Sequence, residues 1–160
     1  MDRKPVTVRS YANIAIIKYW GKKAEQEMVP ATSSISLTLE NMFTETTLSP
    51  LSADASSDAF YINGQLQNEA EHVKMSKIID RYRPEGAGFV RIDTKNNMPT
   101  AAGLSSSSSG LSALVKACNA YFQLGLDRKE LALEAKFASG SSSRSFYGPL
   151  AAWDKDSGEI

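Results

Sequence analysis

The sequence is poor in the residues that bind metals or form disulfides. Among 160 residues it has one cysteine, Cys118, and one histidine, His72. A lone cysteine cannot form an internal disulfide, which is typical of a reducing compartment. Cys118 lies on the apolar face of a predicted helix, where we expect a small buried side chain and no nucleophile. His72 lies beside acidic residues on a predicted surface helix, so we expect a solvated histidine. We therefore predict no metal site and no histidine-based triad.

The sequence also lacks an excess of charge and any long hydrophobic run. Eighteen basic residues balance eighteen acidic ones, which argues against a global nucleic-acid surface but leaves room for a local basic pocket. No apolar run reaches the ~18 residues that a membrane helix needs, and no apolar stretch follows the N-terminus as in a signal peptide. We expect a cytoplasmic protein with no nucleic-acid or membrane partner, long enough for one domain with its own core.

Alternating and helical patterns of apolar residues divide the chain into short elements. Residues 33–39 and 42–48 are predicted as antiparallel partners, residues 23–31 as a loop, and an Asn-Gly pair marks a hairpin turn. Two helices begin at capping residues, Asn68 with Glu71 and Asp127 with Glu130. We predict strands at 6–10, 33–39, 42–48, 89–95 and 150–153, a hairpin at 60–66, and helices at 68–82, 111–122 and 127–138.

A loop of small residues, 99–110, connects a predicted strand to the apolar helix that starts near residue 111. A strand, a small-residue loop and a helix together build phosphate sites, because the first helical turn offers free N–H groups and a positive dipole end. Small residues let a phosphate approach the backbone, and serines add hydroxyl donors. The alternative is a Ser-rich linker, but the strongly patterned flanks disfavour it.

Two further segments carry basic residues in unusual places. An apolar segment after residue 10, apolar enough to be a buried strand, contains Asn13, Lys18 and Lys22, and buried lysines usually face an anion. The alternative is that the two lysines reach solvent. A second small-residue stretch, 139–145, includes Arg144, whose side chain suits bidentate contact with phosphate or carboxylate. Its alternative is a flexible turn with a surface arginine.

These three segments together carry a resemblance to a known family. The 99–110 loop resembles the phosphate-binding motif of the superfamily of galactokinase, homoserine kinase, mevalonate kinase and phosphomevalonate kinase. The segment from Asn13 through Lys18-Tyr19-Trp20-Gly21-Lys22, together with the Ser-Gly-Ser-Ser-Ser-Arg turn, is similar to one branch, the diphosphomevalonate decarboxylases. The resemblance spans residues 6–153.

The resemblance implies a fold and a reaction. The implied fold is an α+β two-layer sandwich like domain 2 of ribosomal protein S5, with a left-handed βαβ crossover. The implied reaction is the ATP-dependent decarboxylation of mevalonate 5-diphosphate to isopentenyl diphosphate, with release of ADP, phosphate and CO2. It implies ATP as co-substrate, Mg²⁺, and a homodimer for the complete enzyme. Two polyanions must lie close together, so such a site needs donors that neutralise charge without reacting.

The resemblance also assigns roles to individual residues. Arg144 and Asn13 would hold the substrate carboxylate, and Lys18 would neutralise charge where phosphate is transferred. The substrate diphosphate would contact Tyr19, Trp20, Gly21, Lys22, Lys74, Ser139, Gly140, Ser141, Ser142, Ser143 and Arg144. ATP would contact Thr94, Gly103, Leu104, Ser105, Ser106 and Ser107. A solvated helix lysine is the alternative for Lys74.

The sequence departs from the family in two ways. Serine stands at Ser105, Ser108 and Ser109 where the family often has alanine, and we expect these hydroxyls to be tolerated and to add donors. Family members are much longer, and their C-terminal half supplies a catalytic aspartate that nothing here matches, Asp154 and Asp156 included. We therefore expect residues 1–160 to be one N-terminal domain without its C-terminal partner and with little activity alone.

Two other functions fit parts of the sequence. A small-molecule kinase such as mevalonate kinase would share the phosphate loop, although the Lys-Tyr-Trp-Gly-Lys segment and the turn that contains Arg144 argue against it. A non-enzymatic binding domain of the S5-like fold is disfavoured by the zero net charge.

Overall fold

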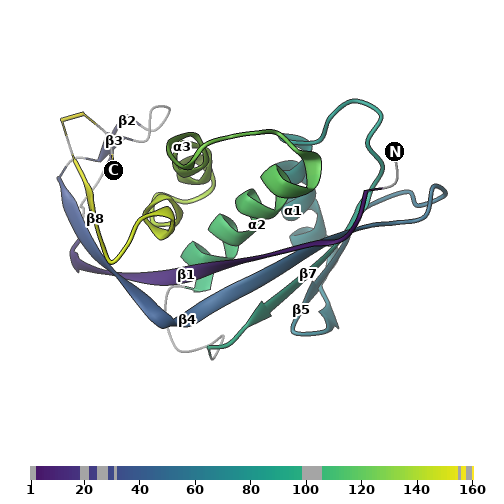
Figure 1. The fold of residues 1–160 in the computed structure, drawn as a ribbon, viewed down its shortest axis with the longest axis horizontal. Helices are drawn as coiled ribbons and strands as arrows, with labels where there is room; N and C mark the ends of the chain where they lie inside the picture. Colours follow the sequence, from purple (N-terminus) through teal and green to yellow (C-terminus); the bar gives the residue numbers. More distant parts are fainter. Residues whose placement is uncertain are drawn as a thin grey trace.

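Three helices cover one face of a six-stranded sheet in the computed structural model (Figure 1). The structure describes residues 3–18, 22–24, 29–30, 32–98, 106–154, 156–157 and 160. The strand order is β1-β4-β7-β5-β6, and β8 pairs with β4. This arrangement confirms the α+β class. The sheet strands are β1 Val6–Ile17, β4 Ser34–Pro50, β5 Ala59–Ile62, β6 Gln65–Leu66, β7 Val90–Asn96 and β8 Leu150–Trp153, and the helices are α1 Glu69–Asp80, α2 Ser106–Phe122 and α3 Arg128–Ala138.

The long strand β4 replaces the two strands predicted at residues 33–39 and 42–48. These segments do not pair with each other, because both pair with β1, from Val6↔Leu48 to Ile17↔Ile35. The register shifts between Tyr11↔Phe43 and Ala12↔Leu39, so β4 carries extra residues at 40–42. A bulge inserts residues without reversing the chain, and this one explains the interruption that resembled a turn.

The hairpin and the first helix follow their sequence signals. Asn63 and Gly64 have φ values of 48° and 80°, as the turn between β5 and β6 requires. Asn68 caps α1 by accepting a hydrogen bond from the Glu71 backbone N–H at 3.0 Å. The parallel pair β5 and β7 is joined through α1, which gives the expected βαβ unit; its left-handed sense stays a prediction of the resemblance.

His72 is not the solvated residue that the sequence predicted. It is half-buried, and its Nε2 lies 3.2 Å from the Phe60 backbone N and 3.3 Å from the Phe60 O. The side chain therefore ties α1 to β5, because helix α1 turns this position towards the sheet. The prediction was wrong because it rested on the acidic sequence neighbours of His72. Adjacent residues of a helix lie on different faces, so these neighbours do not indicate where His72 points.

Helices α2 and α3 pack between the sheet and solvent. α2 begins at Ser106, five residues before the predicted helix, so part of the serine run is helical. Gly125, with φ 73°, follows the helix end. α3 begins at a complete capping box in which Asp127 accepts from the Glu130 N–H and the Glu130 side chain accepts from the Asp127 N–H.

The main core lies between the sheet and the helices. Leu48, Ile79, Val90, Val115 and Cys118 are completely buried there. Burial raises the pKa of the Cys118 thiol to about 12, which agrees with the prediction of a small buried side chain. In the part of the chain that the structure describes, no helix is long and apolar enough to cross a bilayer.

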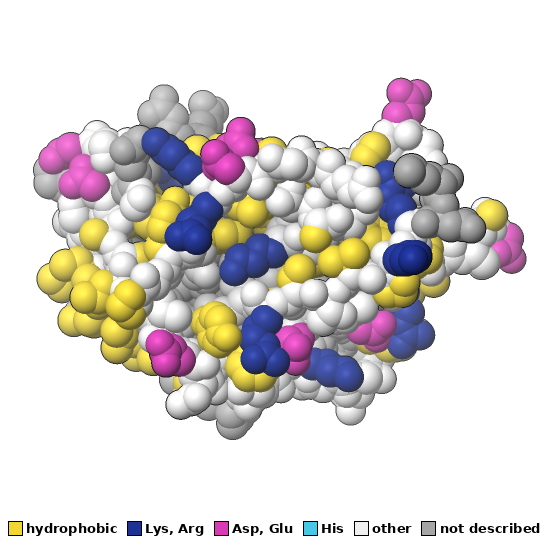
Figure 2. Space-filling model, viewed as in Figure 1, with side chains coloured by type: hydrophobic (Ala, Val, Ile, Leu, Met, Phe, Trp, Pro, Cys, Tyr) yellow, Lys and Arg dark blue, Asp and Glu magenta, His cyan; other side chains and the backbone are white. Residues whose placement is uncertain are grey.

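The opposite face of the sheet is apolar at one end. Ile14, Leu37 and Leu150 are aligned across β1, β4 and β8, and all three are exposed. Hydrophobic side chains gather at the end of the molecule where Figure 1 places β8 (Figure 2). The second half of β1 is therefore not the buried strand that its composition suggested, because Ile16, Ile17 and Lys18 are exposed as well. Residues 23–31 were predicted as a loop, but β2 (Lys22–Ala24) and β3 (Val29–Pro30) form a small antiparallel pair.

Candidate functional site

The serine-rich turn before β8 forms a buried polar cluster. Its residues form the short 3₁₀ helix η1, Ser142–Phe146, which packs against β1, α2 and α3. We call Asn13, Ser34 and residues 141–145 the polar cluster. Apart from half-buried Ser141, every member is nearly or completely buried, Arg144 to 3% exposure and Asn13 to 2%. The alternative of a flexible turn with a surface arginine is therefore wrong.

Asn13 and Arg144 fix the geometry of the polar cluster. Asn13 Nδ2 donates to the Ser141 carbonyl at 3.0 Å and to Ser145 Oγ at 2.8 Å. Arg144 Nη1 donates to Ser34 Oγ at 2.8 Å. Among the described residues, Asn13 Oδ1 and Ser142 Oγ have no hydrogen-bond partner although both atoms are buried. Buried polar atoms without partners are rare in native structures and mark places where a ligand or water can complete the network.

A second buried cation lies near the cluster. Lys136 of α3 is 6% exposed, and its Nζ lies 5.5 Å from the centre of the Trp153 ring in β8. Desolvation lowers the pKa of Lys136. Lys136 and Arg144 of η1 are thus two cationic side chains in the buried part of the described structure.

Ser34 is a site residue that the sequence analysis missed. It lies on β4 where serines alternate with Ile35 and Leu37, a pattern that usually buries the apolar side chains. Here the polar face is buried: Ser34 contacts Arg144 of η1 and Ser36 contacts Ala151 of β8, while Ile35 and Leu37 are exposed. If Arg144 had been expected to be buried, the need for hydroxyl partners could have indicated that the serine face of this strand is the buried one.

Hydroxyl groups anchor the first turns of α2 to the sheet. Ser10 Oγ and Ser112 Oγ are 2.6 Å apart, and Thr44 Oγ1 and Ser109 Oγ are 2.8 Å apart. Ser108 and Ser109 are completely buried. We expected these two serines to add donors for a ligand, but both face the protein interior. They therefore fix the position of the helix N-terminus.

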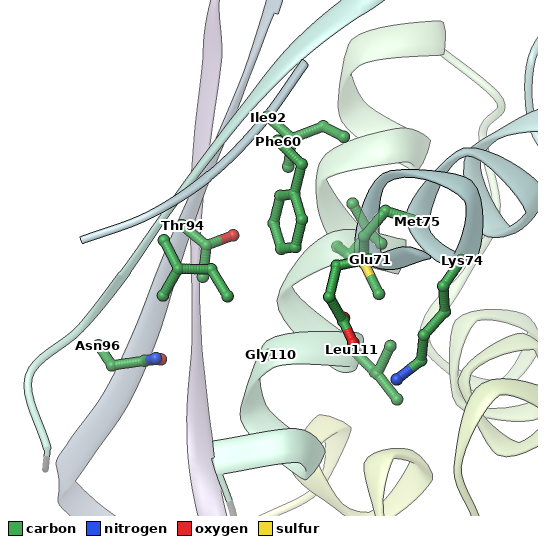
Figure 3. A pocket seen from close by; sticks show the side chains of 11 residues that line it. Phe60, Glu71, Lys74, Met75, Ile92, Thr94, Asn96, Gly110 and Leu111 are labelled. Carbon is green, nitrogen blue, oxygen red and sulfur yellow. The ribbon is translucent and has the colours of Figure 1, made fainter. Parts of the chain in front are cut away.

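A cavity of about 210 Å³ lies beside the N-terminal half of α2. Phe60, Ile92 and Met75 make its apolar wall, and Thr94 and Lys74 are among its polar side chains (Figure 3). Lys74 extends from α1 towards the start of α2 (Figure 3). Lys74 was predicted to contact the substrate diphosphate, whereas the structure brings it together with Thr94, a predicted nucleotide contact. We call this space the α1–α2 pocket; its lining also includes Ile62, Glu71, Asn96, Gly110, Leu111 and Leu114.

The other predicted site residues divide into four groups. Ser139, Gly140, Ser141, Ser142 and Ser143 lie in or beside the polar cluster. Lys18 is exposed just after β1 ends. Lys22 lies in β2 and Ser106 and Ser107 lie in the first turn of α2, but the structure describes the backbone alone at these positions. The remaining predictions fall outside the described residues: Tyr19, Trp20, Gly21, Gly103, Leu104 and Ser105.

Known proteins with the same fold and similar sequence include decarboxylases. The mevalonate pyrophosphate decarboxylase of Streptococcus pyogenes is 69% identical, with a TM-score of 0.92 over 100% of this chain and 51% of its own. The mevalonate diphosphate decarboxylase of Enterococcus faecalis is 43% identical, with a TM-score of 0.83 over 95% of this chain and 48% of its own. Another structure, 43% identical with a TM-score of 0.83 over 95% of this chain and 47% of its own, is a complex with MVAPP, AMPPCP and magnesium.

A curated relative supports the same grouping. The diphosphomevalonate decarboxylase of Debaryomyces hansenii is 36% identical over 156 residues, which are 89% of this chain and 40% of the relative. The chain thus spans between two fifths and about half of the proteins that it matches. Residues 10–159 match the family described as the diphosphomevalonate decarboxylase-like N-terminal domain. With this match and the confirmed fold, the chain belongs to the diphosphomevalonate decarboxylase-like N-terminal domain family.

Proposed function

We propose that this chain supplies the nucleotide-binding and carboxylate-binding parts of an ATP-dependent mevalonate diphosphate decarboxylase. The reaction transfers a phosphoryl group from ATP to the tertiary hydroxyl of mevalonate 5-diphosphate. The bond from the tertiary carbon to the phosphorylated oxygen then breaks as phosphate leaves, CO2 is lost, and the electrons of the broken C–C bond form the double bond of isopentenyl diphosphate. ADP, phosphate and CO2 are the other products.

The polar cluster is the observation that supports this proposal most. A carboxylate that leaves as CO2 must be held in a fixed orientation while the negative charge on the substrate is offset. Arg144 offers a planar, permanently charged donor in a buried site, and the neighbouring Asn13 is held by two hydrogen bonds. Because the cluster is buried, its charge acts with less screening than in water. We assign the substrate carboxylate to these two residues.

The α1–α2 pocket and the N-terminus of α2 suit the nucleotide. The apolar wall of Phe60, Met75 and Ile92 can take a flat ring, and Thr94 and Lys74 add polar contacts beside it. The first turn of α2 offers backbone N–H groups for the phosphates, with Ser106 and Ser107 at that turn. We reassign Lys74 from the substrate diphosphate to the nucleotide, because it shares this pocket with Thr94.

Magnesium would be held mainly by the nucleotide. Among the described residues, no group of three or more histidine, cysteine or acidic side chains is placed to hold a metal ion. Mg²⁺ commonly binds through phosphates, waters and one or two carboxylates. When bound, it would neutralise phosphate charge during transfer. Lys18, exposed after β1, would add positive charge at the same point.

The remaining catalytic group would come from a second half. The related proteins are about twice as long as this chain or longer, and the resemblance assigns the catalytic aspartate to their C-terminal part. We therefore propose that residues 1–160 bind both ligands but do not release CO2 by themselves. Measurable CO2 release by the pure 160-residue chain would contradict this part of the proposal.

Calorimetric titration with mevalonate diphosphate tests the assignment of Arg144. We expect Arg144→Lys to weaken binding about tenfold or more, because lysine keeps the charge but loses the planar fork. Binding of AMPPCP should stay unchanged, because the nucleotide occupies the other pocket. Arg81→Lys, at the exposed end of α1, is the matched control. Equal affinity of the Arg144→Lys variant and the unmodified chain would refute the role.

A further inference from the structure

A shallow hollow of about 570 Å³ lies where β1, α2, α3 and η1 meet, and none of the described residues that line it is assigned above to either ligand. Three of its four polar lining residues are basic, Arg9 from β1, Lys116 from α2 and Arg128 from the first turn of α3; the fourth, Asn119 of α2, is neutral. Val8, Leu131 and Phe146 make its apolar part. Lys and Arg side chains lie along the middle of this face, over β1 and the helices (Figure 2). The described residues that line the hollow include no carboxylate.

Lys116 is the central cation of the hollow. It is half-buried; its Nζ donates to Ser10 Oγ at 3.3 Å and lies 4.8 Å from the centre of the Phe146 ring. Both contacts are with neutral groups, so neither cancels the charge. Burial first, and the positive charge of Arg128 second, lower the pKa of Lys116. The amine therefore stands in an environment that an anion would improve.

The charges around Lys116 do not balance locally. Arg9 is offset by Glu45, 3.3 Å away across the β1–β4 pair. Arg128 makes no ion pair with the described residues and is exposed. Asp127, its sequence neighbour, is turned into the capping box, where it accepts from the Glu130 N–H at 2.9 Å. Two uncompensated positive charges, those of Lys116 and Arg128, thus face one hollow.

We propose that this hollow binds a small phosphate monoester, with the phosphate between Lys116 and Arg128 and a short apolar tail on Val8, Leu131 and Phe146. A phosphate monoester carries close to two negative charges at neutral pH, which matches the two uncompensated cations better than a single carboxylate does. The tail would cover apolar surface that the hollow leaves open to water. The site is separate from both pockets of the proposed function and does not depend on it.

Titration of the 160-residue chain with n-butyl phosphate tests the proposal. AMPPCP is kept at saturation so that the nucleotide pocket is filled, and the methyl resonances of Val8 and Leu131 report binding. We expect both methyl signals to shift with one common dissociation constant. Inorganic phosphate, which lacks the tail, and n-butyrate, which lacks the second charge, should each bind more weakly. No shift of these methyl groups with butyl phosphate would overturn the proposal.

Matched variants locate the phosphate. Arg128→Gln should weaken butyl phosphate binding about threefold, as expected for an exposed charge pair, and Lys116→Met about tenfold, because its charge is half-buried. Lys129→Gln changes the neighbouring exposed cation, which does not line the hollow, and should leave the affinity unchanged. Because Arg128 is exposed, its variant is expected to fold even if Lys116→Met does not. Equal affinities of the Arg128→Gln and Lys129→Gln variants would contradict the site, as would butyrate or inorganic phosphate binding as tightly as butyl phosphate.

Discussion

At the scale of single residues, the site depends on polar side chains that the strands bury. Three elements supply these side chains: Asn13 comes from β1, Ser34 from β4 and Arg144 from η1. Both strand residues make hydrogen bonds to η1 on the buried face of the sheet. The sequence pointed to Arg144, because a serine-rich turn that contains an arginine is distinctive, and the structure buries this side chain; its contact with a substrate stays a prediction. The role of Ser34 could not be predicted, because alternation shows that a strand has two faces but does not say which one is buried.

Ser34→Ala tests the support of Arg144. The change removes a hydroxyl that accepts from the guanidinium at 2.8 Å and leaves a buried donor without that partner. A hydrogen bond to a charged group contributes about 1.5–3 kcal/mol, so we expect the free energy of unfolding in urea to fall by that amount. Ser36→Ala is the control, because Ser36 is equally buried but its bond to the Ala151 carbonyl is long, at 3.4 Å. Equal losses in the two variants would contradict the account.

Lys74→Met tests the reassignment of Lys74 to the nucleotide. Methionine keeps most of the aliphatic length and removes the charge, so we expect AMPPCP to bind about threefold to tenfold more weakly in calorimetry. Lys77→Met is the control, because Lys77 lies one turn further along α1, is exposed and does not line the pocket. If Lys74→Met weakens mevalonate diphosphate binding and spares AMPPCP, the original prediction of a diphosphate contact is right instead.

At the scale of elements, sequence signals predicted ends and caps better than pairings. The Asn-Gly turn and the Asp127 capping box appear as expected, because each depends on a few neighbouring residues. The pairing of β4 with β1 depends on segments far apart in the chain, and the bulge at residues 40–42 resembled a turn. Local chemistry could therefore place the elements, whereas the register needed the whole sheet.

Gly110→Ala tests how α2 combines stability with binding. Gly110 lies inside the helix, and an added Cβ would meet no atom within 4 Å. Because alanine favours helix over glycine by about 0.8–1 kcal/mol, we expect the free energy of unfolding to rise by about that amount. Gly110 also lines the α1–α2 pocket, so the new methyl group should weaken AMPPCP binding. Ala120→Gly, at an exposed position of α2, should lower stability and leave binding unchanged; tighter AMPPCP binding by Gly110→Ala would contradict the placement of the nucleotide.

At the scale of the whole molecule, one core supports both the polar cluster and the α1–α2 pocket. The helices that border the α1–α2 pocket pack on the same sheet as η1. In the part of the chain that the structure describes, buried apolar side chains form one cluster between the sheet and the helices; that residues 1–160 are a single domain stays a prediction from length. The exposed apolar end of the outer sheet face could not be predicted, because it depends on which face of β1, β4 and β8 the helices cover.

Alkylation of Cys118 measures the opening of this core. The thiolate is the reactive form, and burial raises the pKa of Cys118 to about 12. Because the pKa of Cys118 is raised in the folded state, the buried neutral thiol makes its full contribution to folding stability below the unfolded pKa, near 8.5. That contribution is lost as the pH rises towards 12. At pH 8 we expect iodoacetamide to label the native chain at least about a thousandfold more slowly than the urea-unfolded chain. Rapid labelling with native circular dichroism retained would contradict a single tight core.

The central claim is that residues 1–160 provide the nucleotide and carboxylate parts of a decarboxylase site that a second half completes. The most direct test is a chimera that joins this chain to the remaining half of the Streptococcus pyogenes relative. That relative is 69% identical to this chain over the whole length of this chain. The assay is release of labelled CO2 from mevalonate diphosphate labelled at the carboxyl carbon. We expect one CO2 and one ADP per turnover by the chimera, turnover largely lost with Arg144→Lys, and none by this chain alone. A folded chimera that consumes ATP without releasing CO2, or an Arg144→Lys chimera with full turnover, would contradict the central claim.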